Sequence, residues 1–318
     1  MIKAVYSALE NMHFQTGNVL EPSCGIGNFM GLVPESMNGA KFYGVELDSI
    51  SGRIAQQLYQ KNSIAVQGFE STNLPDSFFD AAIGNVPFGQ FKVPDKRYDK
   101  HNFLIHDYFF ARTLDKVRPG GVIAFITSKG TLDKENPNVR KYIAQRADLL
   151  GAIRLPNDTF KAAAGTEVTS DIIFLQKRDR LVDIEPDWVH LATDANGIRM
   201  NAYFVDNPEM VLGDMQMVSG PHGMESACIA YENAELGDLS RDAIQNIHAE
   251  ITEFEIDDLE AEDEDLSIPA DPDVRNYSFT LVDGEVYYRE GGIMVRQSVS
   301  AAMTERIKGL MELRDCTR

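Results

Sequence analysis

The stretch VLEPSCGIGNFMG, residues 19–31, decides the fold. It starts in a short apolar run, passes an acid and a proline, and reaches Gly25 and Gly27, which let the backbone turn tightly against a ligand. A buried strand that runs into such a turn and then into a helix is typical of the first unit of a doubly wound α/β sheet. We therefore expect a strand at 18–20, a ligand-binding loop after it and a helix that opens from the loop.

Apolar runs and helical patterns alternate along the rest of residues 1–180. The runs are short and rich in β-branched and aromatic residues, which favours strands buried on both faces. The helical pattern at 51–59 places Ile54, Ala55 and Leu58 on one side, where we expect them to cover the sheet. The alternation predicts an α/β fold, a doubly wound and mostly parallel seven-stranded sheet of the Rossmann-like kind. The expected strands are 18–20, 41–47, 64–67, 81–83, 122–127, 149–155 and 171–176, and the expected helices are 51–59, 105–117 and 138–146.

The chain changes character after this first domain, which we expect to span 1–180. The residues that follow lack a strand–helix rhythm, so we expect an irregular acidic extension over 181–252. Residues 253–273 are dense in Asp and Glu and end in prolines, which is typical of a solvated acidic linker; an acidic docking segment is the alternative. In 274–318 the Asp-Gly pair at 283–284 lies between two β-type runs, which predicts a β-hairpin before a C-terminal helix.

Charge is divided unevenly between the two parts of the chain. The net charge of −19 argues against a nucleic-acid partner when it is taken as a mean. Residues 1–180 carry 21 Lys and Arg against 19 Asp and Glu, a net +2, whereas residues 181–318 carry 9 against 30, a net −21. The first domain is therefore compatible with a polyanionic partner, and the second part is a poor candidate for DNA contact.

Composition excludes several classes of protein. No apolar run reaches the ~18–20 residues that span a bilayer, and the N-terminus lacks a secretory signal pattern. Cys24, Cys228 and Cys316 lie far apart, which excludes a disulfide framework and a CxxC zinc site. We expect a cytoplasmic protein with no membrane partner and no metal.

The glycine loop matches a cofactor without a pyrophosphate better than a dinucleotide. A dinucleotide fold requires G-x-G-x-x-G, but Met30 occupies the third glycine position. S-adenosylmethionine suits this loop, because its amino-acid part can meet the Glu21 region and the loop amides. Glu46 follows Gly27 by 19 residues at the end of the second strand, where a carboxylate can accept both ribose hydroxyls. The alternative is a glycine-rich turn with a surface glutamate.

The segment Gly84-Asn85-Val86-Pro87-Phe88-Gly89 follows the fourth strand, which such a fold places beside the first. An exocyclic amine is a poor nucleophile because its lone pair is delocalised into the ring. Two acceptors, the Asn85 side-chain oxygen and a main-chain carbonyl, would hold its hydrogens and direct the lone pair at a sulfonium methyl. Phe88 can stack on the base. The alternative is a turn with a buried phenylalanine.

Together, EPSCGIGNFMG, GVELD, GNVPFG, PGGVIAFITSKG and TSDIIFLQKR resemble an N6-adenine DNA methyltransferase with the cofactor motif before the catalytic motif. The resemblance covers about residues 3–180 and is strongest to the methylase domains of large helicase–methylase proteins of bacterial conjugative elements and phages. It implies a Rossmann-like methyltransferase fold, S-adenosylmethionine as cofactor, and DNA and a helicase region as partners. The implied catalytic residues are Asn85, Val86, Pro87 and Phe88, and the implied cofactor-binding residues are Glu21, Pro22, Cys24, Gly25, Gly27, Asn28, Phe29, Glu46, Leu47, Phe69, Glu70 and Asn85.

Two features depart from the family pattern. The family motif usually has proline at its second position, where this chain has Val86; the backbone carbonyl is still available, but one conformational restraint is lost. The family also has an aromatic–x–Pro segment before the first helix, and this chain begins almost at that helix, so we expect it to be cut from a longer one.

A basic loop follows the catalytic motif. Cations interleaved with aromatic residues beside a reactive pocket suit backbone phosphates and a flipped base, although a solvated charged loop is the alternative. Lys129 follows the fifth strand at the same sheet edge. The expected substrate-binding residues are Lys92, Lys96, Arg97, Lys100 and Lys129.

The sequence thus favours methyl transfer from S-adenosylmethionine to the N6 amine of adenine in DNA. A methylase of RNA or of protein glutamine is one alternative, since similar motifs act on those substrates. A non-catalytic module that binds cofactor or DNA, or that supports a helicase, is the other.

Overall fold

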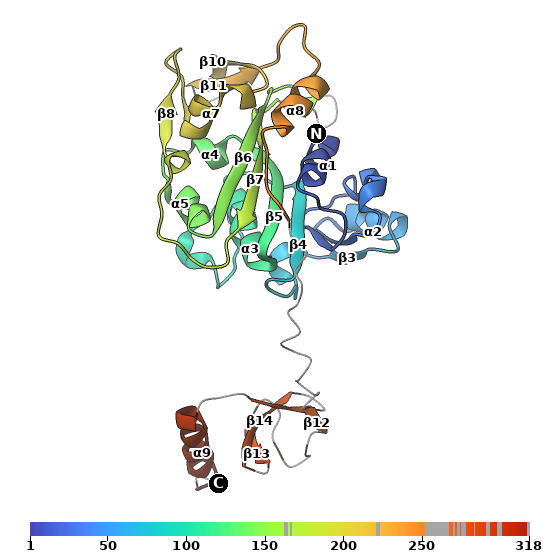
Figure 1. Ribbon diagram of the computed structural model, residues 1–318, viewed down its shortest axis with the longest axis vertical. Helices are drawn as coiled ribbons and strands as arrows, with labels where there is room; N and C mark the ends of the chain where they lie inside the picture. The colour runs from blue at the N-terminus through green and yellow to red at the C-terminus, as the bar shows by residue number, and fades with distance from the viewer. Residues whose placement is uncertain are drawn as a thin grey trace. The chain divides into compact units, whose positions relative to one another are not determined.

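The computed structural model describes residues 1–161, 165, 167–220, 223–251, 267–269, 271, 274, 278–282, 284–290, 293–297 and 301–316. They belong to two compact units, Met1–Thr252 and Glu253–Arg318, both drawn in Figure 1.

A seven-stranded sheet forms the centre of the first unit. Its strand order is β3-β2-β1-β4-β5-β7-β6, and every neighbouring pair is parallel except those made by β7, which runs antiparallel to both β5 and β6. This confirms the predicted doubly wound, mostly parallel sheet. The strands are β1 (Asn18–Glu21), β2 (Lys41–Glu46), β3 (Ser63–Val66), β4 (Phe79–Asn85), β5 (Val117–Ser128), β6 (Ala147–Leu155) and β7 (Ser170–Lys177).

Helices pack around this sheet, with α2 beside β3 and α5 beside β6 at its two ends (Figure 1). The central strands are buried because their runs are apolar on both faces; Ile123, Phe125 and Phe174, for example, have no exposed surface. No described helix is long and apolar enough to cross a membrane. The helices are α1 (Ile2–Asn11), α2 (Ser49–Leu58), α3 (Ile105–Lys116), α4 (Gly130–Asp133), α5 (Asn138–Ala144), α7 (Ala202–Asp206) and α8 (Leu236–Ile244).

The expectation that a helix opens from the glycine loop is wrong. Within residues 22–40, all of which the structure describes, the chain forms only two short 3₁₀ turns, Met30–Leu32 and Glu35–Met37. Pro34 lies between them and cannot donate the backbone hydrogen bond that a continuing α-helix needs. The loop therefore returns to β2 without a helix.

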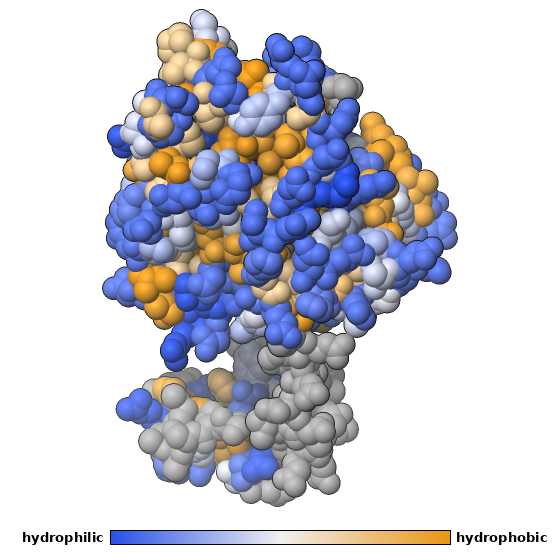
Figure 2. Space-filling model, turned by 45° about the horizontal axis from the view of Figure 1, so that its top comes forward, coloured by the Kyte–Doolittle hydropathy of each residue, from blue (hydrophilic) through white to orange (hydrophobic). Residues whose placement is uncertain are grey.

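Helix α2 presents its large apolar residues to solvent, contrary to the expected packing of Ile54 and Leu58. Ile54 is 42% exposed and Leu58 61% exposed. Gly52 faces the sheet instead, and a Cβ there would lie 2.9 Å from Val66 Cγ2, so the helix sits too close to β3 for a large side chain. Figure 2 shows a strip of hydrophobic surface on the side where Figure 1 places α2.

Residues 181–251 pack as part of the first unit, so the expected boundary at 180 does not separate compact units. They also form regular elements, which corrects the expectation of an irregular extension. Buried side chains from this part, such as Phe204, Met210 and Ile247, join the core of the sheet. The additional elements are the pair β8 (Leu191–Thr193) and β9 (Arg199–Asn201), the hairpin β10 (Asp214–Gly220) and β11 (Gly223–Ile229), and helices α7 and α8.

The second unit contains a four-stranded antiparallel sheet, in the order β12-β15-β14-β13, and helix α9 (Ala301–Cys316). Val282 pairs with Glu285 across the turn, which confirms the predicted hairpin between β13 (Phe279–Val282) and β14 (Glu285–Glu290). β15 (Ile293–Arg296) lies between β14 and β12 and pairs with both. β12 (Ser267–Pro269) lies inside the predicted linker 253–273, and most other residues of that linker lie outside the described part of the chain.

Candidate active site

The predicted site residues gather at the topological switch point of the sheet, where the strand order reverses between β1 and β4. β1 pairs in parallel with β2 on one side and with β4 on the other, so the three strands end at the same edge of the sheet. Glu21 ends β1, Glu46 ends β2 and Asn85 ends β4. This is the crevice in which open α/β sheets bind their ligands.

The glycine loop turns at this edge and is held by backbone contacts to β2. Gly25 and Gly27 have φ angles of +54° and +86°, which favour glycine over residues with a side chain. Cys24 N donates to Val45 O at 2.9 Å, and Gly25 N donates to Glu46 Oε2 at 2.8 Å. A Cβ on Gly25 would meet nothing within 4 Å, so the backbone at this glycine faces open space.

The Glu21 carboxyl is buried beneath the loop with an unsatisfied oxygen. Glu21 is 1% exposed, and its Oε2 has no hydrogen-bond partner. Burial, with a smaller contribution from Glu46, raises the pKa of Glu21 well above its ordinary value. A buried acceptor without a donor fits a cationic amine, which the amino-acid part of S-adenosylmethionine carries.

Glu46 already accepts two backbone hydrogen bonds from its own chain. Oε2 takes the Gly25 amide, and Oε1 takes the Asp48 amide at 2.7 Å. These bonds fix the carboxylate at the end of β2. Each carboxylate oxygen can accept a second bond, so the pair predicted with the ribose hydroxyls remains compatible with this geometry.

The 85–88 segment separates into a buried anchor and exposed functional groups. Val86 is 1% exposed, and its amide donates to Ile126 O of β5 at 3.0 Å. Asn85 is exposed, and Phe88 is 41% exposed. The valine thus anchors the turn through packing, while the amide and the ring face solvent at the sheet edge.

Direct contacts join this segment to the glycine loop. Ser23 Oγ donates to Asn85 O at 2.9 Å, so the cofactor loop and the catalytic motif touch. A Cβ on Gly84 would lie 3.7 Å from Glu21 Cγ, which shows how closely β4 passes the buried acid. The structure therefore brings Glu21, Glu46 and Asn85 around one loop.

The other predicted cofactor residues differ in exposure. Leu47 is 76% exposed beside Glu46. Phe69 is 3% exposed and packs against Tyr108 and Phe109, whereas the half-buried Glu70 accepts a bond from Ser71 Oγ at 3.1 Å. Of Phe69 and Glu70, the glutamate therefore has the more accessible side chain. Pro22, Cys24 and Phe29 are buried in the loop, and Asn28 is exposed.

Three of the five predicted substrate cations have partners in the protein. Arg97 forms ion pairs with Asp76 at 2.7 Å and with Asp115 at 2.9 Å. Lys129 Nζ donates to Ser226, and burial lowers its pKa. In the described part of the chain, Lys96 and Lys100 are exposed and enter no ion pair, and Lys92 donates to Asn102. The described residues contain no cluster of His, Cys, Asp or Glu suited to a metal.

Two contacts of the site were not predicted. Tyr6 of α1 donates its hydroxyl to Phe29 O at 2.7 Å, and the nearby Glu21 adds to the burial that raises the pKa of Tyr6. Tyr6 gave no sequence signal for this contact, since Phe29 lies 23 positions away. Ser23 gave none, since its bond to Asn85 joins residues 62 positions apart.

Residues 5–196, more than half of the chain, match the N-6 DNA Methylase family. The chain belongs to the N-6 DNA Methylase family. This confirms the resemblance to an N6-adenine DNA methyltransferase, and with the seven-stranded sheet it confirms a Rossmann-like methyltransferase fold whose cofactor is S-adenosylmethionine.

Individual relatives match parts of the chain. It is 32% identical over 197 residues to the Defense against restriction protein B of Escherichia phage P1, a match that covers 60% of this chain and 8% of that protein. It is 36% identical over 75 residues to the Type II methyltransferase M.CvrRI of Paramecium bursaria Chlorella virus XZ-6E, a match that covers 24% of this chain and 19% of that protein. The chain therefore spans a small share of the length of these relatives.

Among solved structures, it is similar to the methyltransferase subunit of a type I restriction-modification system from Streptococcus thermophilus. That likeness has 13% sequence identity and a TM-score of 0.48, and it covers 78% of this chain and 53% of the other.

Proposed function

We propose that this chain transfers a methyl group from S-adenosylmethionine to the N6 amine of adenine in DNA. The observation that carries the proposal is the contact between Ser23 of the glycine loop and Asn85 O, because it joins the cofactor loop to the catalytic segment. Membership of the N-6 DNA Methylase family supports the same reaction.

The chain's own residues would bind the cofactor at the loop and orient the amine. The buried Glu21 carboxylate would accept the cofactor's ammonium, and Glu46 its ribose hydroxyls. The cofactor supplies an electrophilic sulfonium methyl when bound. Asn85 Oδ1 and a main-chain carbonyl of the motif would accept hydrogen bonds from the two amine N–H groups and so free the nitrogen lone pair for attack. The new N–CH3 bond would form as the CH3–S bond breaks, with S-adenosylhomocysteine as leaving group and one amine proton lost to solvent.

Phe88 would hold the target base by stacking. Its ring is 41% exposed, next to the exposed Asn85. Base–aromatic stacking contributes ~1–3 kcal/mol and requires the base to leave its own stack. The proposed substrate is therefore an adenine extruded from a duplex or present in single-stranded DNA.

The direct test measures transfer of labelled methyl groups to DNA by the wild type and by Asn85→Ala. We expect the variant to lose about 10²–10³-fold in rate, because one preorganised acceptor is removed. Asn38→Ala, an exposed asparagine on another loop, is the matched control and should keep the wild-type rate.

The substrate class is decided by offering DNA, RNA and protein to the same wild-type preparation and identifying the methylated product by mass. N6-methyladenine in DNA supports the proposal. Methylated RNA or glutamine would replace it with one of the alternative enzymes, and no product together with no cofactor binding would favour a supporting, non-catalytic role.

We also propose that the chain acts in the cytoplasm as part of a longer, mobile-element protein with a helicase region. The resemblance to helicase–methylase proteins supports this, as does a phage P1 relative of which the chain spans 8%. By the name of that relative, methylation would serve defence against restriction. Detection of the parent polypeptide by mass and of its ATPase activity on DNA tests the proposal.

A further inference from the structure

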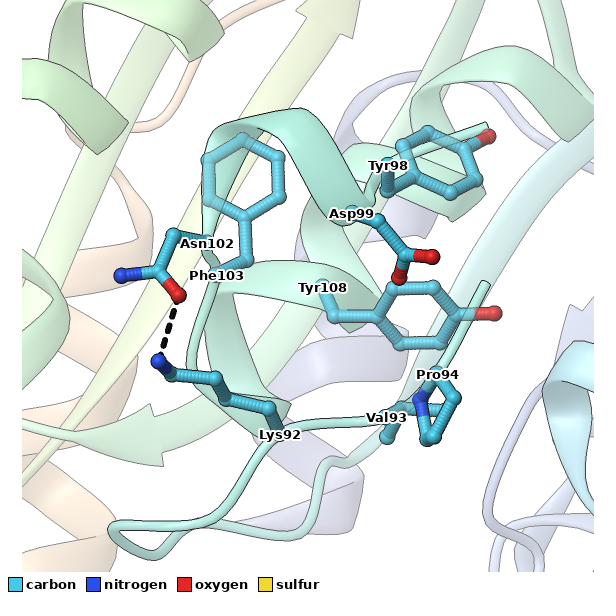
Figure 3. A pocket seen from close by; sticks show the side chains of 8 residues that line it. All are labelled: Lys92, Val93, Pro94, Tyr98, Asp99, Asn102, Phe103 and Tyr108. Atoms are coloured by element: carbon cyan, nitrogen blue, oxygen red, sulfur yellow. Dashed lines mark hydrogen bonds between the residues drawn. The ribbon is translucent and has the colours of Figure 1, made fainter. Parts of the chain in front are cut away.

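The loop that follows the catalytic segment encloses a small pocket that the proposed methyl transfer does not use (Figure 3). Its volume is about 260 Å³. Ligand sites for drug-sized molecules usually measure ~300–1,000 Å³, so this pocket suits a single planar ring system. The lining residues are Lys92, Val93, Pro94, Tyr98, Asp99, Asn102, Phe103 and Tyr108.

Aromatic rings and apolar groups form its walls. Tyr98 and Tyr108 meet edge to face with centroids 5.5 Å apart. Their hydroxyls point out of the pocket, towards acceptors elsewhere: Tyr98 donates to Asp115, and Tyr108 donates to Asp95 at 2.8 Å. The rings therefore line the pocket with carbon, although Tyr98 and Tyr108 are only 3% and 1% exposed, and they keep no unsatisfied hydroxyl inside.

The pocket is held in shape by a network beneath it. Asp95 accepts bonds from Tyr108 and, at 2.7 Å, from the buried Arg112, which also donates to Thr72 O at 3.0 Å. Asp95 N donates to Asp99 Oδ1 at 2.9 Å. These contacts tie the loop to α3, so the site is already formed and the loop would lose little conformational entropy when a ligand binds.

The polar residues of the lining are Lys92, Asp99 and Asn102, and in Figure 3 the Asp99 carboxylate lies between the two tyrosine rings. Lys92 Nζ donates to Asn102 Oδ1, and in Figure 3 both side chains lie at the same side of the opening. Asn102 adopts a left-handed backbone conformation, with φ +57°, which turns this exposed residue out of the 3₁₀ turn before it. Amide and carboxylate oxygens can accept a hydrogen bond from the exocyclic amine of adenine or cytosine.

The charge around the rim suits a nucleic-acid strand. Arg97 and Arg112 neutralise carboxylates of the loop and of its neighbours. The exposed Lys96 and Lys100 enter no ion pair within the described residues, so they leave a positive surface for backbone phosphates.

We propose that this pocket binds one unstacked, amine-bearing base next to the target adenine and so contributes to sequence preference, with Asn102 as the residue that reads it. The inference rests on the proposed DNA methylation. Phe88 is three residues before Phe91, whose carbonyl accepts the Ile105 amide at 2.9 Å, so the chain that holds the target base continues directly into the pocket loop.

The experiment uses the full chain, a random-sequence DNA library and S-adenosylmethionine, with methylated adenines read by sequencing. Asn102→Gly removes the side chain and tolerates the positive φ. His13→Gly is the matched control, because His13 is exposed and has φ +60° at the end of α1. We expect the wild type and His13→Gly to prefer adenine or cytosine at one position that flanks the methylated adenine. In Asn102→Gly that preference should fall at least about fivefold.

Other outcomes overturn the inference in different ways. If Asn102→Gly methylates with the wild-type flanking profile, the pocket does not read a base. If calorimetry shows that Asn102→Gly binds S-adenosylmethionine more weakly, with an unchanged melting temperature, the pocket belongs to the cofactor site. If the wild type methylates no DNA, the proposed function fails; the pocket is then tested by anisotropy, and equal affinity for random and abasic oligonucleotides would rule out a base in it.

Discussion

At the residue scale, Glu21 couples cofactor binding to a proton. Its folded pKa lies well above the ordinary value of 4.5, so between pH 4.5 and the folded pKa the folded free chain holds a proton that the unfolded chain has lost. This contribution to stability is present below pH 4.5 and is lost as the pH rises through the folded pKa. A cationic ligand reverses the preference, so binding should release the proton.

Glu21→Gln copies the protonated form and tests this coupling. We expect the free variant to melt a few degrees above the wild type at pH 8 (about 2–4 °C for each kcal/mol) and the difference to shrink towards pH 4. Its affinity for S-adenosylmethionine should fall about 10–100-fold, because a bond to a charged group is lost. Thermal melts across this pH range and calorimetry are the measurements, and a variant that melts below the wild type at pH 8 would show that Glu21 is already charged.

His106 makes folding stability depend on pH in the opposite direction to Glu21. It is 4% exposed, neither ring nitrogen has a hydrogen-bond partner, and burial lowers its pKa below 6.5 in spite of Asp107. The nearby Lys134, which is paired with Asp107, also opposes protonation. The unfolded state therefore binds the extra proton, so stability is complete above pH 6.5 and falls as the solution is acidified.

His106→Gln should remove that dependence. Below pH 6.5 the wild-type free energy of unfolding should decline up to about 1.4 kcal/mol per pH unit more steeply than that of the variant. Urea titrations at pH 5, 6 and 7 measure the slopes. Parallel slopes for the two proteins would mean that His106 is not the titrating group.

Some residues of the site could be placed from the sequence, and others could not. Glu21, Glu46 and Asn85 were placed correctly at strand ends because a parallel sheet gathers those ends at one edge. The partners of Arg97 were not predictable, since Asp76 and Asp115 lie 21 and 18 positions away and reach it only in the folded chain.

At the element scale, a buried ion network joins β6 and β7 to the residues after 180. Arg154 and Asp171 are both fully buried and meet through two bonds of 2.9 and 3.0 Å. Arg154 also pairs with Asp133 at 2.9 Å and lies over the Phe204 ring. Burial opposes its charge, but the two carboxylates raise the pKa of Arg154, so it stays charged.

Removing one member of this pair should cost more than removing both. We expect Asp171→Leu to lower the free energy of unfolding by ~3–5 kcal/mol, because it strands a buried charge. Arg154→Met combined with Asp171→Leu should cost less than the sum of the single changes. Denaturant unfolding measures all three; Asp238→Leu, which breaks an exposed pair with Arg241, should cost less than ~1 kcal/mol, and additive costs would contradict the coupling.

Strands were easier to predict than helix faces. Buried parallel strands such as β5 carry continuous apolar runs that few other elements share. In α2 the residues that face the sheet are small, Gly52 and Ala55, so the hydrophobic pattern was right for Ala55 and wrong for Ile54 and Leu58, which are exposed. A close helix–strand approach is a property of the packed pair, and no single-helix pattern records it.

At the scale of the whole molecule, the compact unit extends beyond the seven strands. Leu212 N donates to Arg154 O at 2.9 Å, and Asn201 Nδ2 donates to Leu132 O at 3.0 Å. Cys228 N donates to Thr169 Oγ1 at 2.9 Å. These bonds connect short elements that lack a periodic apolar pattern, which is why the sequence suggested a boundary at 180.

Truncation tests this organisation directly. A chain of residues 1–251 should unfold in one cooperative transition and keep its affinity for S-adenosylmethionine, because it retains the described first unit. A chain of residues 1–180 should lose cooperative folding, since it removes Phe204 from Arg154 and Ile247 from the core. Circular dichroism melts and calorimetry compare the two with the full chain. A 1–180 chain with the wild-type melting temperature would show that the sheet is stable by itself and that residues 181–251 only cover it.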